Sequence, residues 1–173
     1  FSVQNGREIG GYLNEDITLT KDRYWIISSS LMIPEGITVD IEPGTQVQFY
    51  SAGDADVYIR SDGALNITGT EEEPVQLFLG SGYENKSVKI TGNAVISYAE
   101  IVNPEIDVTS IDHVNAYGNA EDKALCFKAG TVRRSRVSTK VNYSQYLDIG
   151  SKDPDTYDCV LFDNCTAENS GTT

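Results

Sequence analysis

Residues 36 to 49 read Gly-Ile-Thr-Val-Asp-Ile-Glu-Pro-Gly-Thr-Gln-Val-Gln-Phe. Apolar side chains occupy alternate positions on both sides of the Pro43-Gly44 pair. A period of two sends successive side chains to opposite faces of an extended chain. The stretch therefore predicts two short β-strands joined by a turn, each with one apolar face and one polar face.

The same alternation continues outward from this stretch in both directions. Each run is only a few residues long and ends at a breaker, such as Pro34-Glu35-Gly36, Asp62-Gly63 or Gly80-Ser81-Gly82. No segment carries apolar residues at the i, i+3, i+4, i+7 spacing over a length that predicts a helix. The sequence therefore predicts an all-β fold.

A longer repeat distinguishes between the all-β architectures. Residues 63 to 78 repeat the order found in residues 36 to 49: a glycine, a short apolar strand, a Gly-Thr turn, and a second strand with a phenylalanine. Strands of a sandwich are usually longer, whereas an echo separated by a few tens of residues is typical of a solenoid. One coil cannot bury its inward side chains alone, so stacked coils share a core.

The order of these pieces resembles a known family. Residues 24 to 78, including Tyr24-Trp25-Ile26-Ile27 and Pro74-Val75-Gln76-Leu77-Phe78, resemble the entry coils of bacterial right-handed parallel β-helix proteins of the pectate-lyase-like superfamily. Residues 94 to 117 and 158 to 165 resemble further coils. The resemblance implies a right-handed parallel β-helix in a secreted or cell-surface protein. It implies a fold rather than an activity.

In this fold the hydrophobic end of the first coil must be covered. We expect residues 1–20 to form an N-terminal cap and residues 21–173 to form the coils of a single domain. No equivalent cap follows residues 157 to 165, which still have the pattern of a coil. The expectation is a longer parent chain, truncated here, or a partner that covers the last coil.

Composition excludes some partners. The net charge is -13, with 13 Lys and Arg against 26 Asp and Glu, so nucleic acid is not expected as a ligand. No apolar run approaches the roughly 20 residues that span a bilayer, so membrane insertion is not expected either. The three cysteines, Cys126, Cys159 and Cys165, lack metal-ligand spacing. Three thiols in strand positions are favoured over one disulfide and a free thiol.

Two patches are candidates for catalysis. Ile111-Asp112-His113 resembles part of the Trp-Ile-Asp-His motif of pectate lyases, which bind acidic sugars through calcium held by aspartates. The sequence departs from that motif because Ser110 replaces the tryptophan, and no Arg-x-Pro-x-x-Arg pattern supplies the family's catalytic arginine. An ordinary turn or strand edge, with a hydrogen-bonded His113, is the favoured interpretation.

The second patch, residues 131 to 140, holds the densest positive charge. On a single strand Arg134, Arg136 and Lys140 would share one face and could bind a sugar carboxylate. A solvated outer face that pairs with the excess carboxylates is the favoured interpretation, and such pairs contribute only about 0–1 kcal/mol.

Paired carboxylates and calcium ligands are two further kinds of site that this fold can carry. Glycoside hydrolases of this fold use two carboxylates on neighbouring coils, but the Asn-x-Asp and Asp-Asp pattern of polygalacturonases is absent. The loop that contains Asp153, Asp155 and Asp158 has the oxygen density that calcium prefers, without the glycine and glutamate of an EF-hand. A polar loop is favoured, so no cofactor is expected, with Ca²⁺ as the alternative.

The ten tyrosines could line a sugar-binding groove, since an aromatic ring offers an apolar face and a polar edge. We name Tyr98 and Tyr117, with Arg134, Arg136 and Lys140, as candidate ligand-binding residues. The predicted function is a non-catalytic module that presents a rigid face to a polysaccharide or a surface protein. The alternatives are a polysaccharide lyase or glycoside hydrolase, and a structural scaffold. An acid pair in a cleft, or Asp112 aligned with Arg134 or Arg136 on adjacent coils, would favour catalysis.

Overall fold

The computed structural model describes residues 6–51, 53, 55–83, 85–118 and 125–139, together with short strands at 146–148, 157–158, 161–163 and 166–168. Its strands are β1 (Arg7–Tyr12), β2 (Ile17–Leu19), β3 (Tyr24–Ile33), β4 (Thr38–Ile41), β5 (Gln46–Phe49), β6 (Tyr58–Thr68), β7 (Val75–Leu79), β8 (Val88–Val102), β9 (Pro104–Gly118), β10 (Leu125–Arg133), β11 (Arg136–Thr139), β12 (Tyr146–Asp148), β13 (Tyr157–Asp158), β14 (Leu161–Asp163) and β15 (Thr166–Glu168). Across these ranges no helix is long and apolar enough to cross a membrane.

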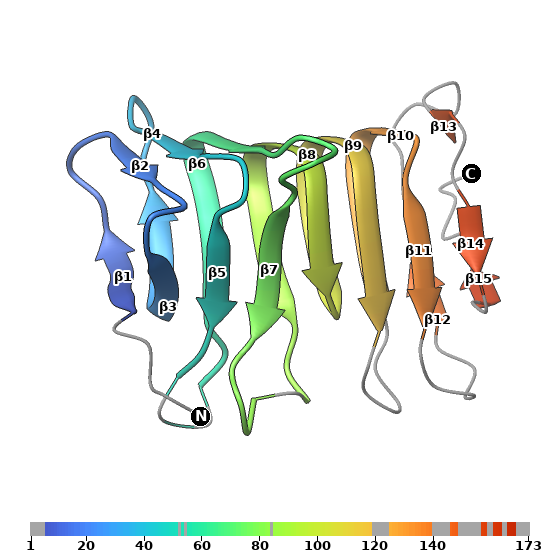
Figure 1. Cartoon of the computed structure of the whole chain (residues 1–173), viewed down its shortest axis with the longest axis horizontal. Coiled ribbons are helices and arrows are strands. Elements are labelled where there is room, and N and C mark those ends of the chain that lie inside the picture. The colour runs from blue at the N-terminus through green and yellow to red at the C-terminus, as the bar shows by residue number, and fades with distance from the viewer. Residues whose placement is uncertain are drawn as a thin grey trace.

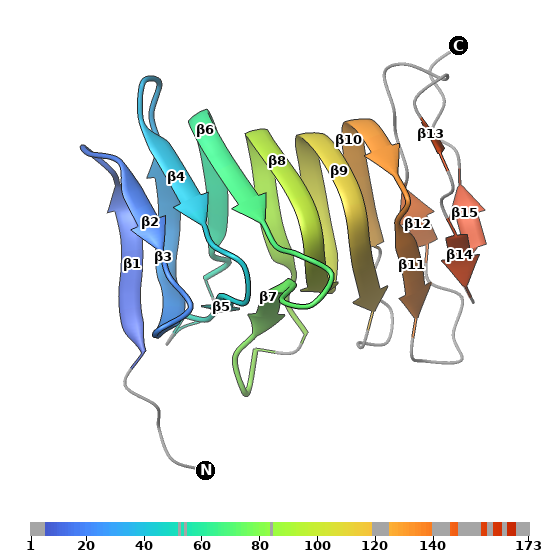
Figure 2. The ribbon, with the colours of Figure 1, turned by 45° about the horizontal axis from the view of Figure 1, so that its top comes forward.

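Every strand pairing is parallel, and each strand pairs with the segment that lies one coil further along the chain (Figure 1). The chain passes in turn through three faces of a solenoid, here called A, B and C, and then starts the next coil (Figure 2). Face A holds residues 7–9, 24–27, 46–49, 75–79, 99–102, 114–118, 136–139 and 161–163. Face B holds residues 11–12, 31–33, 58–61, 88–91, 104–108, 125–129, 146–148 and 166–168. Face C holds residues 17–19, 38–41, 64–68, 94–97, 110–112, 131–133 and 157–158.

The core consists of inward-facing apolar side chains stacked in rows from coil to coil. On face C one row is almost fully buried and consists of Leu19, Ile41, Ile67, Ile96, Ile111 and Val132. Rows on faces A and B meet the face C row inside the coil. The row on face A consists of Trp25, Val47, Leu77, Ile101, Ala116 and Val137. The alternating residues of the sequence thus sort into core and surface, which confirms the predicted parallel β-helix.

The longest strands turn corners without a loop. β8 and β9 each run through parts of all three faces, and the coil from Ile101 to Ala116 is strand almost throughout. Other coils carry loops between faces, such as residues 50–57 between β5 and β6. Loop-free corners bring side chains of adjacent coils into register, and this places the site described below.

The N-terminal segment contributes strands of its own. β1 pairs with β3 and β2 pairs with β4, so residues 7–19 form a first coil over the core. Leu13 and Ile17 of this coil are only partly buried against the core. The prediction that residues 1–20 act as the cap of the domain stays a prediction.

Candidate functional site

The corner between faces C and A carries three unusual backbone conformations. Tyr98, His113 and Arg134 have φ angles of 49°, 50° and 42°. The register of the flanking strands makes them equivalent residues of successive coils, because Ser97 pairs with Asp112 and Asp112 pairs with Arg133. Residues with a Cβ enter this left-handed region at a cost of about 1–2 kcal/mol each, and glycine is the residue that usually occupies it.

A fourth non-glycine residue with positive φ has a structural reason for this backbone conformation. Asn103, at the corner between faces A and B, has a φ of 46° and is fully buried. Its amide side chain donates to the carbonyl of Lys86 at 3.2 Å, and its backbone bonds to Tyr117 and Val88. Asparagine tolerates this conformation, and here its side chain satisfies a buried carbonyl. Tyr98, His113 and Arg134 instead direct their side chains to the surface, which makes these corners a candidate functional site.

The rings of Tyr98 and His113 form a stacked pair. Their centroids lie 4.3 Å apart, and the angle between the ring planes is 8°. In the preceding coil the equivalent corner residue is Gly69, because its neighbour Thr68 pairs with Ser97. No side chain from that corner can therefore lie on the outer face of the Tyr98 ring.

Asp112 and Arg134 join two adjacent coils through a bidentate ion pair. Arg134 Nε donates to Asp112 Oδ1 at 2.9 Å, and Nη2 donates to Oδ2. Nδ1 of His113 lies 3.1 Å from Asp112 Oδ1, although it makes no hydrogen bond of good geometry within the described part of the chain. The carboxylate therefore holds the arginine and faces the imidazole at the same corner.

The surroundings of Asp112 act on its acidity in opposite directions. Partial burial raises the pKa of this carboxyl, but the hydrogen bond from Arg134 and the charges of His113 and Arg134 outweigh that effect and lower the pKa overall. A carboxyl with a lowered pKa is ionised at neutral pH and is a poor proton donor. Its carboxylate in turn stabilises the cationic form of Arg134, which disfavours that arginine as a base.

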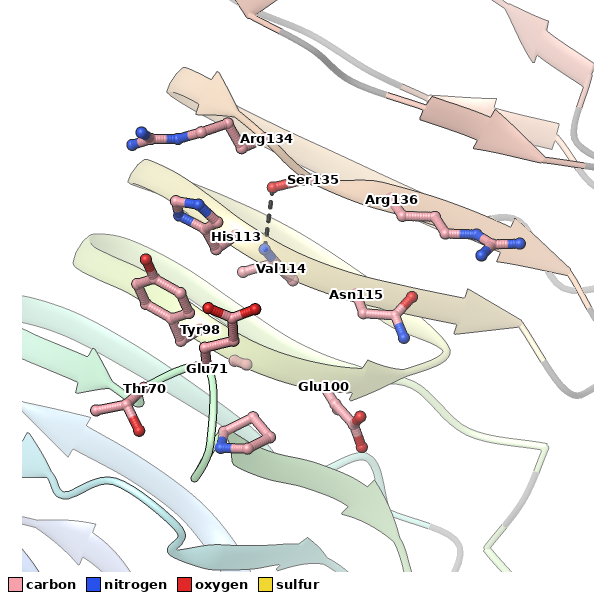
Figure 3. Close-up of a pocket in the computed structure, with 12 residues that line it drawn as sticks. Thr70, Glu71, Tyr98, Glu100, His113, Val114, Asn115, Arg134, Ser135 and Arg136 are labelled. Atoms are coloured by element: carbon pink, nitrogen blue, oxygen red, sulfur yellow. Dashed lines mark hydrogen bonds between the residues drawn. The ribbon is translucent and has the colours of Figure 1, made fainter.

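These corner residues form one wall of a groove of about 610 Å³ that follows the solenoid axis. Figure 3 shows Tyr98, His113 and Arg134 in one row, with a second row on face A that consists of Glu100, Asn115 and Arg136. Small or buried residues line the floor between the rows, namely Ala99, Val114 and Ser135. The loop between β6 and β7 closes one end of the groove with Thr70, Glu71 and Pro74.

Ser135 fixes the arginine corner from below. Its Oγ donates to the carbonyl of Arg133 at 2.6 Å and accepts from the backbone N–H of Val114 at 3.1 Å (Figure 3). Both groups would otherwise be unsatisfied where the strand ladder breaks. The corner that presents Arg134 is thus tied to the preceding coil.

The expectation that one strand carries Arg134 and Arg136 is wrong. β10 ends at Arg133 and β11 begins at Arg136, so the chain turns a corner between the two arginines. Both side chains nevertheless line the same groove, from opposite walls. Lys140 lies outside the described residues.

Two carboxylates of the groove were not predicted from the sequence. Glu71 and Glu100 both line it, at the end opposite the arginines, and neither belongs to a motif. Asp112 lies on a coil next to that of Arg134 and pairs with it. The alignment of Asp112 with Arg134 on adjacent coils, which is one arrangement expected to favour catalysis, is therefore present, and Glu71 and Glu100 line one cleft.

The other candidates do not form a site within the described residues. Cys126 is half-buried, and its Sγ donates to the carbonyl of Ile106 at 3.7 Å; Asp56, an acidic residue outside the groove, forms an ion pair with Lys86 at 2.9 Å. No group of three His, Cys, Asp or Glu suited to a metal occurs among the residues with described positions. Asp153, Asp155, Cys159 and Cys165 lie outside those residues, as does the side chain of Asp158.

Comparison with known proteins agrees with this architecture. A family model described as a pectate-lyase like beta helix domain matches residues 11–123, which is more than half of the chain. Neither the curated proteins nor the solved structures gave a significant match. The matched range covers the coils that carry Tyr98, Asp112 and His113, and it ends before Arg134. On this match and on its fold, the chain belongs to the pectate-lyase-like β-helix domain family.

Proposed function

We propose that this domain binds a polysaccharide along the groove between its two rows of side chains. The observation that carries the proposal is the stacked pair of Tyr98 and His113, held at strained corners on the wall of the groove. An aromatic ring on the wall of a groove can pack against the apolar face of a sugar ring. The polar side chains around it can bond to hydroxyl groups.

The solenoid supports this proposal through its rigidity. Apart from the loop at one end, the groove is lined by residues within strands or at short corners between them, so its two rows are held in place before a ligand binds. Little conformational entropy is then lost on association. We propose that the domain acts in a secreted or cell-surface protein, where it meets polysaccharides, and a surface protein is the alternative partner.

Retention in gels that contain one polysaccharide each tests the proposal. Tyr98→Ala is expected to weaken binding of the retained polysaccharide about 10-fold, a loss of about 1.4 kcal/mol. Tyr12→Ala is the matched control, because Tyr12 is 80% exposed and lies on face B, away from the groove. The test requires that both variants melt like the parent protein. The proposal fails if neither variant changes the retention of a polysaccharide, or if both variants change it equally.

Cleavage of the polysaccharide is a second candidate function. It is favoured by the presence of Glu71 and Glu100 in one groove, since glycoside hydrolases act through two carboxylates. It is also favoured by the aligned Asp112 and Arg134, although their ion pair disfavours Arg134 as a proton acceptor.

Release of reducing ends separates cleavage from binding. Acidic and neutral polysaccharides would be incubated with the protein, with and without calcium. Release that disappears in Glu71→Gln, Glu100→Gln, Asp112→Ala or Arg134→Ala would make the domain an enzyme. Retention without release supports a binding module. If the protein shows neither retention nor release, a scaffold function remains.

A further inference from the structure

A second cavity adjoins the groove on face A. Its volume is about 280 Å³, and it is lined by Gln76, Leu77, Phe78, Glu100, Val102 and Tyr117. Glu100 also lines the groove, so the two spaces share this residue. Cavities for drug-sized ligands have volumes of about 300–1,000 Å³, so this one suits a single small ring or substituent.

The walls of this cavity are mainly apolar and are held firmly. Phe78 packs edge-on against Tyr24, with the ring centroids 5.7 Å apart and 60° between the planes. Val102 is only 7% exposed, although it belongs to the outer side of its strand. Tyr117 lies beside it and contributes the second aromatic ring.

Glu100 is the one charged residue among those that line this cavity. It is half-buried, and it makes no ion pair or hydrogen bond with any residue in the described ranges. Burial raises the pKa of Tyr117, and the negative charge of Glu100 raises it further, which agrees with the close approach of the two side chains.

The neighbours of Glu100 on the strand ladder leave its charge without a partner. Glu100 pairs in register with Gln76 on one side and with Asn115 on the other, and both side chains are neutral amides. Gln76 already accepts a hydrogen bond from Gln46 at 3.0 Å. Arg136 follows one coil beyond Asn115, so a neutral residue separates the acidic part of the groove from the arginines.

A carboxylate beside two aromatic rings is suited to a cationic ligand group. An ammonium donates charge-assisted hydrogen bonds to the carboxylate, and it is also attracted to the faces of aromatic rings. Partial burial makes such a pair stronger than one in open solvent. We propose that this cavity is the subsite for the protonated amino group of an amino sugar within the polysaccharide bound in the groove. This inference rests on the proposed function and names the class of sugar.

Three hexasaccharides with the same β-1,4 linkage, one each of glucosamine, N-acetylglucosamine and glucose, test the inference. Calorimetric titration at pH 6, where a primary amine is protonated, is expected to show the glucosamine hexamer binding at least about 10-fold more tightly than the glucose hexamer. Glu100→Gln is expected to remove that preference. A cationic sugar is also attracted by the net charge of -13, so Glu42→Gln, at an exposed position, serves as the charge-matched control and should retain the preference.

The possible failures are distinguishable. Equal binding of the glucosamine and glucose hexamers, or an unchanged preference in Glu100→Gln, would overturn the inference and leave saccharide binding in place. If no hexamer binds while a polysaccharide is still retained through Tyr98, the inference again falls alone. If neither hexamers nor polysaccharides bind, both proposals fall. Tetralysine that binds as tightly as the glucosamine hexamer, and through Glu100, would overturn the sugar assignment in favour of a cationic peptide.

Discussion

The rings of Tyr98 and His113 lie parallel on adjacent coils, with their centroids 4.3 Å apart and 8° between their planes. Both residues have positive φ angles, so the contact depends on two backbone conformations that a glycine would adopt at lower cost. The equivalent corner of the preceding coil is occupied by Gly69, whose φ is not positive, and the next three corners carry side chains. The strain is tolerated because the core and the strand ladders on both sides hold these corners.

The corner strain predicts an inverted order of stability between glycine and alanine. His113→Gly is expected to be more stable than His113→Ala by about 1 kcal/mol, since glycine has no Cβ to strain the left-handed conformation. Both variants lose the ring contact, so the difference between their free energies of unfolding reports the cost of the backbone conformation alone. Urea unfolding at pH 7 measures it.

Asn115 provides the comparison for that prediction. It is exposed and lies within β9, in ordinary strand conformation. There alanine is expected to be the more stable residue, by about 0.5–1 kcal/mol. Finding the same order at both positions would contradict the strain argument.

The Asp112–Arg134 ion pair predicts a pH-dependent contribution to stability. The pKa of Asp112 is lowered below its ordinary value of 3.8, so the folded state binds the proton less readily than the unfolded state does. The stabilisation is therefore fully present above the unfolded-state pKa and is lost as the pH falls through the folded-state pKa. Asp112→Asn is expected to lower the free energy of unfolding by about 1 kcal/mol at pH 7, a modest value because Arg134 is half-exposed.

Urea unfolding of Asp112→Asn and the parent protein between pH 7 and about pH 3 measures this effect. The difference between the two free energies of unfolding should shrink toward the acidic end. Asp107→Asn controls for the removal of one charge from an acidic protein, since Asp107 is exposed on face B. A difference that stays constant over this range, or that Asp107→Asn reproduces, would show that the ion pair is not its cause.

The alternation of residues explains why the fold could be predicted from the sequence. Val39, Ile41, Val47 and Phe49 are inward and buried, as a period of two requires, and the same rule holds within the straight segments of β6 to β9. Inward or outward direction depends only on local parity. The strands from β3 to β9 can thus be divided into core and surface without knowledge of which coils are neighbours.

The site could not be predicted in the same way, because it depends on register between coils. The loops between faces differ in length, so the sequence does not say that Ser97 lies beside Asp112, or that Gln76 lies beside Glu100. The corners at Tyr98 and His113 contain neither glycine nor proline and therefore carry no turn signal. A motif fragment points to Asp112 and His113, and charge density points to Arg134, whereas no sequence pattern marks Glu71 or Glu100.

Trp25 joins the first two coils, and this contact predicts its role in stability. It is 2% exposed, its Nε1 donates to the carbonyl of Thr20 at 3.0 Å, and the guanidinium groups of Arg7 and Arg23 lie 5.4 and 5.7 Å from its ring. Trp25→Ala is expected to lower the free energy of unfolding by about 3–5 kcal/mol, since it leaves a cavity and frees the Thr20 carbonyl. Trp25→Phe should cost clearly less, and an unchanged melting curve for Trp25→Ala would count against this packing.

Gly69 controls how closely the strained corner approaches the preceding coil. A Cβ at this position would lie 2.1 Å from the carbonyl oxygen of Tyr98 and 2.8 Å from the backbone nitrogen of Val75. Both are backbone atoms that cannot move aside without shifting the strands they belong to, and the N–H of Gly69 itself donates to the carbonyl of Ser97. Gly69→Ala is therefore expected to destabilise the domain by more than about 2 kcal/mol and to displace the corner that presents the Tyr98 ring.

Gly53→Ala is the matched control for this last substitution, because a Cβ there has no atom within 4 Å and the residue does not have a positive φ. It should leave both the unfolding curve and polysaccharide retention unchanged. Gly69→Ala should weaken retention even under conditions in which the variant is fully folded, since Tyr98 and His113 would no longer share the same geometry. Normal retention by folded Gly69→Ala would mean that the ligand does not depend on the position of the stacked rings.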